Sequence, residues 1–163
     1  SDVCSSDLSA SVTLIAPRCP VDSADGWSAA QLSAGLSFAA EWLRAHRERL
    51  NGLNVYPVPD GDTGTNMLLT MNSAIAEVNA SGQNGAGAVA AAFAQGALMG
   101  ARGNSGVILS QIWRGFSRAL HGSDVVTAEQ LAKAFAEARL HAQANILKST
   151  QAAKECVLLE GAR

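Results

Sequence analysis

The high alanine content limits the possible folds of this chain more than any other feature of the sequence. Of its 163 residues, 31 are alanine. Alanine has the highest intrinsic helix propensity, and its small side chain allows helices to pack closely. The densest region is 86–101, which is mostly alanine and glycine and is interrupted by Gln95. We therefore expect an all-α fold in which this segment is a tightly packed helix rather than a membrane span. The chain is long enough to form one domain with a buried core.

Charge and cysteine content exclude several classes of protein. The net charge is −2 and the isoelectric point is near 5.9, so there is no basic excess to neutralise the phosphates of a nucleic acid. Cys4, Cys19 and Cys156 are far apart and form no C-x-x-C motif, which argues against a disulfide scaffold or a thiolate zinc site. Residues 11–16 are too short for the apolar region of a secretion signal, and no run of 18 apolar residues occurs in this sequence. We expect a cytoplasmic protein without a membrane span.

Apolar residues recur at helical spacing from Trp27 onward. They predict helices over about 27–52, 63–78, 86–101 and 107–120, and a further helix after Thr127, with Gln130 at the capping-box position. The apolar face of the first helix is expected to contain Trp27, Leu32, Leu36, Ala39, Trp42 and Leu43. Residues 1–22 lack this periodicity, and we expect an unstructured or non-native tail.

The segment 54–66 is too polar and too rich in glycine for an ordinary helix connection. Asp60 and Asp62 flank Gly61, so the backbone can bend and bring the two carboxylates together. Hard oxygen ligands on a short loop suit Mg²⁺, whose remaining positions are filled by phosphate oxygens and water. The first-turn amides of the next helix, near residues 63–66, could hold an anion. The alternative is that Asp62 or Thr63 merely caps that helix.

The segment 100–106 also leads into the start of a helix. Its glycines would let backbone amides approach a phosphate, with the Ser105 hydroxyl as a further donor. The alternative is a simple turn capped by Asn104 or Ser105. No G-K-[ST] sequence is present, so this is not a Walker A loop. Together the two segments indicate a metal–nucleotide phosphate site on an all-helical scaffold.

Two motifs carry a resemblance to a known family. They are N-G-L-N-V-Y-P-V-P-D-G-D-T-G-T-N-M at 51–67 and A-R-G-N-S-G-V-I-L-S-Q at 101–111. The sequence resembles the DhaL-type nucleotide-binding domain of dihydroxyacetone kinases, and more closely the version at the N-terminus of fatty acid kinase catalytic subunits. The resemblance implies an antiparallel helical barrel over 23–138, incomplete at its C-terminus. Residues 139–163 are compatible with a helix but do not match the family, whose later Gly-Thr turn closes over the base.

The resemblance also implies roles for individual residues. Asn54, Asp60 and Asp62 match the metal-binding positions, for two Mg²⁺, and Asp60 and Asp62 would be the catalytic pair. Asn54 stands where dihydroxyacetone kinases have Asp and fatty acid kinases have Asn, which favours the latter. The positions that match the phosphate-binding segments are Thr63, Gly64, Thr65, Asn66, Gly103, Asn104, Ser105 and Gly106.

The implied reaction transfers the γ-phosphoryl group of ATP to a fatty acid presented by a carrier protein, and the full-length protein is expected to be a homodimer. One alternative is an L-type subunit of dihydroxyacetone kinase that holds ADP or ATP. Another is a catalytically inactive helical interaction module.

Overall fold

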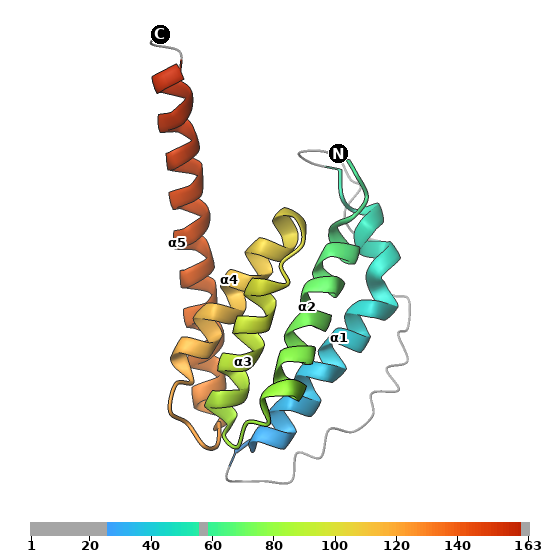
Figure 1. The fold of residues 1–163 in the computed structure, drawn as a ribbon, viewed down its shortest axis with the longest axis vertical. Coiled ribbons are helices and arrows are strands. Elements are labelled where there is room, and N and C mark those ends of the chain that lie inside the picture. The colour runs from blue at the N-terminus through green and yellow to red at the C-terminus, as the bar shows by residue number, and fades with distance from the viewer. Residues whose placement is uncertain (1–25, 56–58, 161–163) are drawn as a thin grey trace, which may run out of the picture.

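The computed structural model describes residues 26–55 and 59–160, and within them it contains five helices and no strand (Figure 1). The helices are α1 (Ala29–Gly52), α2 (Thr63–Ser81), α3 (Ala86–Met99), α4 (Gly103–Ala119) and α5 (Ala128–Glu160). Successive helices run in opposite directions (Figure 1). The expectation of an all-α fold is confirmed. The expected tail over 1–22, with Cys4 and Cys19, lies outside the described residues.

The alanine-rich helix α3 is at the centre of the core, as its composition predicts. It packs between α2 and α4, and most of its residues are buried. Small residues permit this close approach: a Cβ added at Gly96 would lie 2.8 Å from the Cα of Ala74 in α2. On the other side, the ring of Phe93 meets Trp113 of α4 edge-on, with centroids 4.8 Å apart. None of the described helices combines the length and apolar character needed to cross a bilayer.

The buried face of α1 differs from the one expected. Leu32, Leu36 and Leu43 are buried as predicted. Ala40 is buried as well, whereas Ala39, which was expected in the core, is exposed. Trp42 is 50 % exposed, and its ring stacks on His46. Steps of four, four and three residues from position 32 stay on one side of a helix. Position 39 lies at the edge of that stripe, and position 42 lies well outside it.

Trp27 precedes α1 and belongs to a short backbone contact. Its N–H donates to the carbonyl of Val126 at 2.8 Å, and the N–H of Val126 donates back at 2.9 Å. This pair joins the entry to α1 with the connection between α4 and α5, and we call it the Trp27–Val126 clasp. Ser28 then caps α1 in a capping box with Gln31.

The start of α5 has the predicted capping box. The N–H of Thr127 donates to Gln130 Oε1 at 2.9 Å, and the N–H of Gln130 donates to Thr127 Oγ1 at 3.2 Å. Among the described helices, α5 packs on α4 alone. It continues without interruption past Ala138 and extends beyond the ends of the other helices (Figure 1).

Helix α4 begins at Gly103, four residues before the expected start at Val107. Residues 103–106 are therefore the first helical turn and not a separate loop. Gly103 has a φ of +57°, a backbone conformation in which a glycine carries no side-chain penalty. The helix thus opens directly from a sharp turn at this glycine.

Candidate functional site

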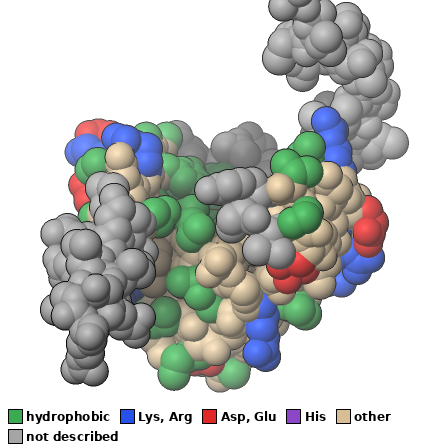
Figure 2. Space-filling model, turned by 90° about the horizontal axis from the view of Figure 1, so that it is seen from above, with side chains coloured by type: hydrophobic (Ala, Val, Ile, Leu, Met, Phe, Trp, Pro, Cys, Tyr) green, Lys and Arg blue, Asp and Glu red, His purple; other side chains and the backbone are tan. Residues whose placement is uncertain are grey.

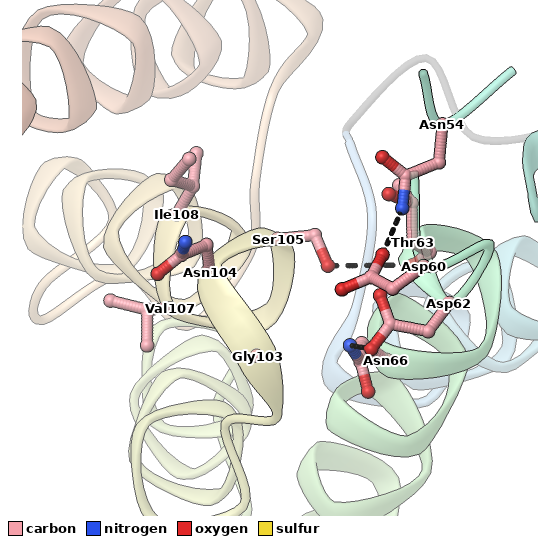
Figure 3. A pocket seen from close by; sticks show the side chains of 10 residues that line it. All are labelled: Asn54, Asp60, Asp62, Thr63, Asn66, Gly103, Asn104, Ser105, Val107 and Ile108. Atoms are coloured by element: carbon pink, nitrogen blue, oxygen red, sulfur yellow. Dashed lines mark hydrogen bonds between the residues drawn. The ribbon is translucent and has the colours of Figure 1, made fainter. Parts of the chain in front are cut away.

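A pocket of about 610 Å³ opens at the end of the bundle where α1 finishes and both α2 and α4 begin (Figure 3). Its lining residues are Asn54, Asp60, Asp62, Thr63, Asn66, Gly103, Asn104, Ser105, Val107 and Ile108. The two polar segments singled out in the sequence thus face one another across one cavity, although they are about forty residues apart. Eight of the eleven predicted site residues line it.

The two carboxylates of the pocket are each held by a neighbouring amide. Asn54 Nδ2 donates to Asp60 Oδ1, and Asn66 Nδ2 donates to Asp62 Oδ2 at 2.6 Å. In Figure 3 both carboxylates lie on the same wall of the cavity. No ion pair within residues 26–55 and 59–160 involves either of them. Each carboxylate keeps an oxygen outside these hydrogen bonds, and two neighbouring negative charges favour a bound cation.

The first turn of α2 is capped by a residue of another helix. Asp62 is at the N-cap position, but its side chain makes no capping bond with a backbone N–H of the turn. Instead, Asn51 in α1 accepts from the N–H of Thr65 at 3.1 Å and donates to Thr65 Oγ1 at 3.1 Å. The simple capping role considered for Asp62 or Thr63 is therefore not what the structure has. Because Asn51 performs it, the Asp62 carboxylate is left to the pocket.

The start of α4 forms the opposite wall, and it has no side-chain cap either. Arg102 is the N-cap residue, so neither Asn104 nor Ser105 has the capping role considered above. The amides of residues 103–105 have no acceptor in the described part of the chain, as is usual for a first helical turn. Such amides, at the positive end of a helix dipole, attract anions. Ser105 Oγ reaches across the cavity to the carbonyl oxygen of Thr63, at 3.5 Å.

Three predicted phosphate-binding residues do not line the pocket. Gly64 is buried against α1, where an added Cβ would lie 2.4 Å from the carbonyl oxygen of Arg47. Thr65 is bound to Asn51 as described. Gly106 packs on α2, where an added Cβ would lie 2.4 Å from Thr70 Oγ1. The structure gives these residues packing contacts between helices and does not bring them to the cavity.

Sequence reasoning missed the apolar part of the pocket. Val107 and Ile108 are 51 % and 39 % exposed, and they lie beside Asn104 on the α4 side (Figure 3). Seen from this end, hydrophobic and uncharged groups occupy the middle of the surface, and charged side chains lie mainly toward its rim (Figure 2). The available signal was helical spacing, because Ile108 follows Asn104 by four residues and shares its face.

The donor set of the pocket fits a magnesium ion better than a softer metal. No group of three or more His, Cys, Asp or Glu residues with metal-ligand placement occurs in the described ranges. The available protein ligands are therefore Asp60, Asp62 and amide oxygens such as that of Asn54. Mg²⁺ is commonly bound by one or two carboxylates together with phosphate oxygens and water. Two carboxylates leave the other positions of such an ion to water or phosphate oxygens.

Comparisons with known proteins identify the family of the chain. A family model described as the DAK2 domain matches residues 57–154, which is more than half of the chain and extends past Ala138. An uncharacterized protein of Staphylococcus saprophyticus is 51 % identical over 96 residues, which are 59 % of this chain and 17 % of that protein. Uncharacterized proteins of Staphylococcus haemolyticus and Staphylococcus aureus USA300 are 49 % and 48 % identical over the same length. The chain spans less than a fifth of the length of these relatives.

Proposed function

The chain belongs to the DAK2 domain family of DhaL-type nucleotide-binding modules, and from this we propose that its pocket binds a magnesium–ATP complex as part of a kinase. The observation that carries the proposal is that two walls of the pocket, with opposite electrostatic character, face each other. One wall presents the Asp60 and Asp62 carboxylates, and the other presents the open amides of α4. A polyphosphate with its cation has both kinds of charge, so a single ligand could satisfy both walls.

Each wall would have a distinct task. Asp60 and Asp62 would hold Mg²⁺, which when bound withdraws negative charge from the phosphates. The amides of residues 103–105 and the Ser105 hydroxyl would orient the phosphate oxygens. Val107 and Ile108 offer an apolar surface for the less polar part of the nucleotide. Catalysis by such a site consists of positioning and charge neutralisation, with no covalent intermediate on the protein.

The phosphoryl acceptor is proposed to be the carboxylate of a fatty acid presented by a carrier protein. Support comes from Asn54, whose side chain donates to Asp60. An Asp at this position, as in dihydroxyacetone kinases, would put a third carboxylate beside Asp60. The metal site would then have one more negative charge than it has with Asn54. The test is phosphate transfer from ATP by the longer protein that contains this domain, to a fatty-acid-loaded carrier or to free dihydroxyacetone. Transfer to dihydroxyacetone alone would contradict the proposal.

Nucleotide binding can be tested on the chain itself by thermal unfolding. Mg²⁺ and ATP together should raise Tm, because a ligand that binds only the folded state stabilises it. At a hundred times Kd the gain is about 2.7 kcal/mol, or about 5–10 °C for a domain of this size. ATP with a chelator should give little of this rise. Asp62→Asn should remove most of it while leaving the Tm of the free protein unchanged or higher, since a negative charge is removed beside Asp60.

The matched control is Asp124→Asn. Asp124 is an exposed carboxylate at the opposite end of the bundle, beside the start of α3, so this variant makes the same chemical change away from the pocket. It should keep the full ligand-induced rise. Absence of any rise in the wild-type chain at millimolar ATP and Mg²⁺ would refute nucleotide binding by this domain. A catalytically inactive interaction module would give that result.

A further inference from the structure

Thr70 is a buried polar residue that the binding site described above does not use. Among the described side chains, Thr70 and Ser110 are the two buried polar ones, and both are 0 % exposed. Thr70 lies in α2, one helical turn beyond Asn66. Its hydroxyl donates to the backbone carbonyl of Asn66 at 2.8 Å and accepts from the backbone N–H of Arg102 at 3.2 Å. A threonine hydroxyl often bonds to the carbonyl one turn earlier, but the second bond is not local.

The two hydrogen bonds of Thr70 connect the two walls of the pocket. Asn66 belongs to the carboxylate wall, because its side chain holds Asp62. Arg102 is the N-cap of α4, directly before the open amides of the opposite wall. Gly106 completes the contact, since an added Cβ there would lie 2.4 Å from Thr70 Oγ1. One oxygen atom therefore touches the backbone of both walls at the point where they come together.

We propose that Thr70 is a positioning residue for nucleotide binding, which sets the separation between the Asp62 carboxylate and the open amides of α4. This inference rests on the proposed function. A ligand that bridges two walls binds well only if both are in place at once, so a small shift of one wall weakens binding by the whole ligand. Removing the hydroxyl leaves the Arg102 amide without its acceptor and frees α4 to move relative to α2.

The test compares variants that keep or remove the hydroxyl. The Kd of Mg–ATP is measured by calorimetry and the Tm by thermal unfolding, for the wild-type chain, Thr70→Ser and Thr70→Val. Thr70→Val should weaken binding at least about tenfold, because the two walls no longer keep the separation that a bridging ligand needs. Thr70→Ser keeps the donor and acceptor and should bind within about threefold of wild type.

The matched control is Ser110→Ala, which removes the other buried hydroxyl. Ser110 Oγ donates to the carbonyl of Val107 at 2.7 Å, and its hydrogen bonds stay within α4. This variant should lower Tm without changing Kd. If Thr70→Val lowers Tm but binds Mg–ATP as wild type does, Thr70 is only a structural residue and the inference is wrong.

A second variant tests the same contact if Thr70→Val does not fold. If Thr70→Val shows no cooperative unfolding transition, Gly106→Ala replaces it, because the added Cβ pushes α4 away from the same hydroxyl and should cause a similar loss of affinity. Unchanged affinity in Gly106→Ala would then overturn the inference. If the wild-type chain itself does not bind Mg–ATP, the proposed function fails, and that result is separate from any effect of Thr70.

Discussion

At the scale of single residues, Gly103 links the backbone of α4 to the side chain that holds Asp62. It has a φ of +57°, and an added Cβ would lie 2.4 Å from Asn66 Nδ2. Asn66 Nδ2 is the atom that donates to Asp62. A side chain at position 103 would therefore both strain the backbone and displace a partner of the proposed metal ligand.

Gly103→Ala should destabilise the fold and also weaken Mg–ATP binding. The backbone cost of a left-handed alanine is about 1–2 kcal/mol. Gly82→Ala is the matched control, because Gly82 also has a φ of +57° but an added Cβ meets no atom within 4 Å. Denaturant unfolding should show a similar backbone cost in both variants, and calorimetry should show weaker binding only in Gly103→Ala. Equal affinities would show that Asn66 does not support the carboxylate wall.

The sequence was sufficient to identify most pocket residues but not to separate them from their neighbours. Thr63 and Thr65 belong to one motif, yet Thr63 lines the pocket while Thr65 is bound to Asn51. A motif gives the residue types, whereas the direction of each side chain depends on where the helix begins and on what packs beside it. The capping role of Asn51 was not predicted, because a cap supplied by a different helix has no local sequence signal.

At the scale of helices, Gly115 decides how closely α4 and α5 can pack. An added Cβ would lie 2.7 Å from the Cα of Ala138 and 2.7 Å from the Cβ of His141. The contact is also fastened by His141 Nδ1, which lies 3.2 Å from the carbonyl oxygen of Gln111. Since α5 packs on α4 alone among the described helices, this contact is what holds it to the bundle.

Gly115→Ala should therefore destabilise the protein, although alanine is a better helix former than glycine. Overpacking of this kind typically costs about 1–3 kcal/mol. Gly52→Ala is the comparison, because an added Cβ at the end of α1 meets nothing within 4 Å. That variant should leave the free energy of unfolding unchanged or raise it by up to about 1 kcal/mol. If denaturant unfolding gives the same result for both variants, close packing at Gly115 does not control the contact.

Helix boundaries and buried faces could be predicted only in part. The capping box of Thr127 and Gln130 is a local signal, and the structure has it. The early start of α4 was not predictable from propensity, because glycine is unfavourable inside helices. The face of α1 was predicted only in part, because apolar residues that recur at three- to five-residue steps do not all lie on the covered side, and Trp42 is 50 % exposed.

At the scale of the whole molecule, the helices should differ in how strongly their backbone amides are protected from hydrogen exchange. α2 and α3 lie within the packed body and carry many of the buried residues, while α5 packs on one helix and extends beyond it. Local opening is easiest where few buried contacts hold the backbone. Amide hydrogen exchange should be slowest in α2 and α3 and fastest toward the C-terminal end of α5. Equal protection at that end of α5 would mean that another surface covers it in solution.

The all-α class could be predicted because it depends on composition and periodicity summed over the whole chain. The neighbour relations of the helices could not be derived in the same way. The close approach at Gly96 and the attachment of α5 to α4 alone depend on shape matching between faces, which a single sequence does not encode in any short pattern. The antiparallel arrangement was implied by family resemblance and not by spacing.

The Trp27–Val126 clasp has a consequence for how this unit can be carried within longer chains. Its two hydrogen bonds place the entry to α1 beside the exit from α4, and all ten residues of the pocket lie between those two points in the sequence. A segment whose two ends meet can be inserted into a loop of a host protein without stretching the host. The two ends of the α1–α4 segment therefore meet at the end of the bundle opposite the pocket, so a longer chain can join this segment there without crossing the pocket.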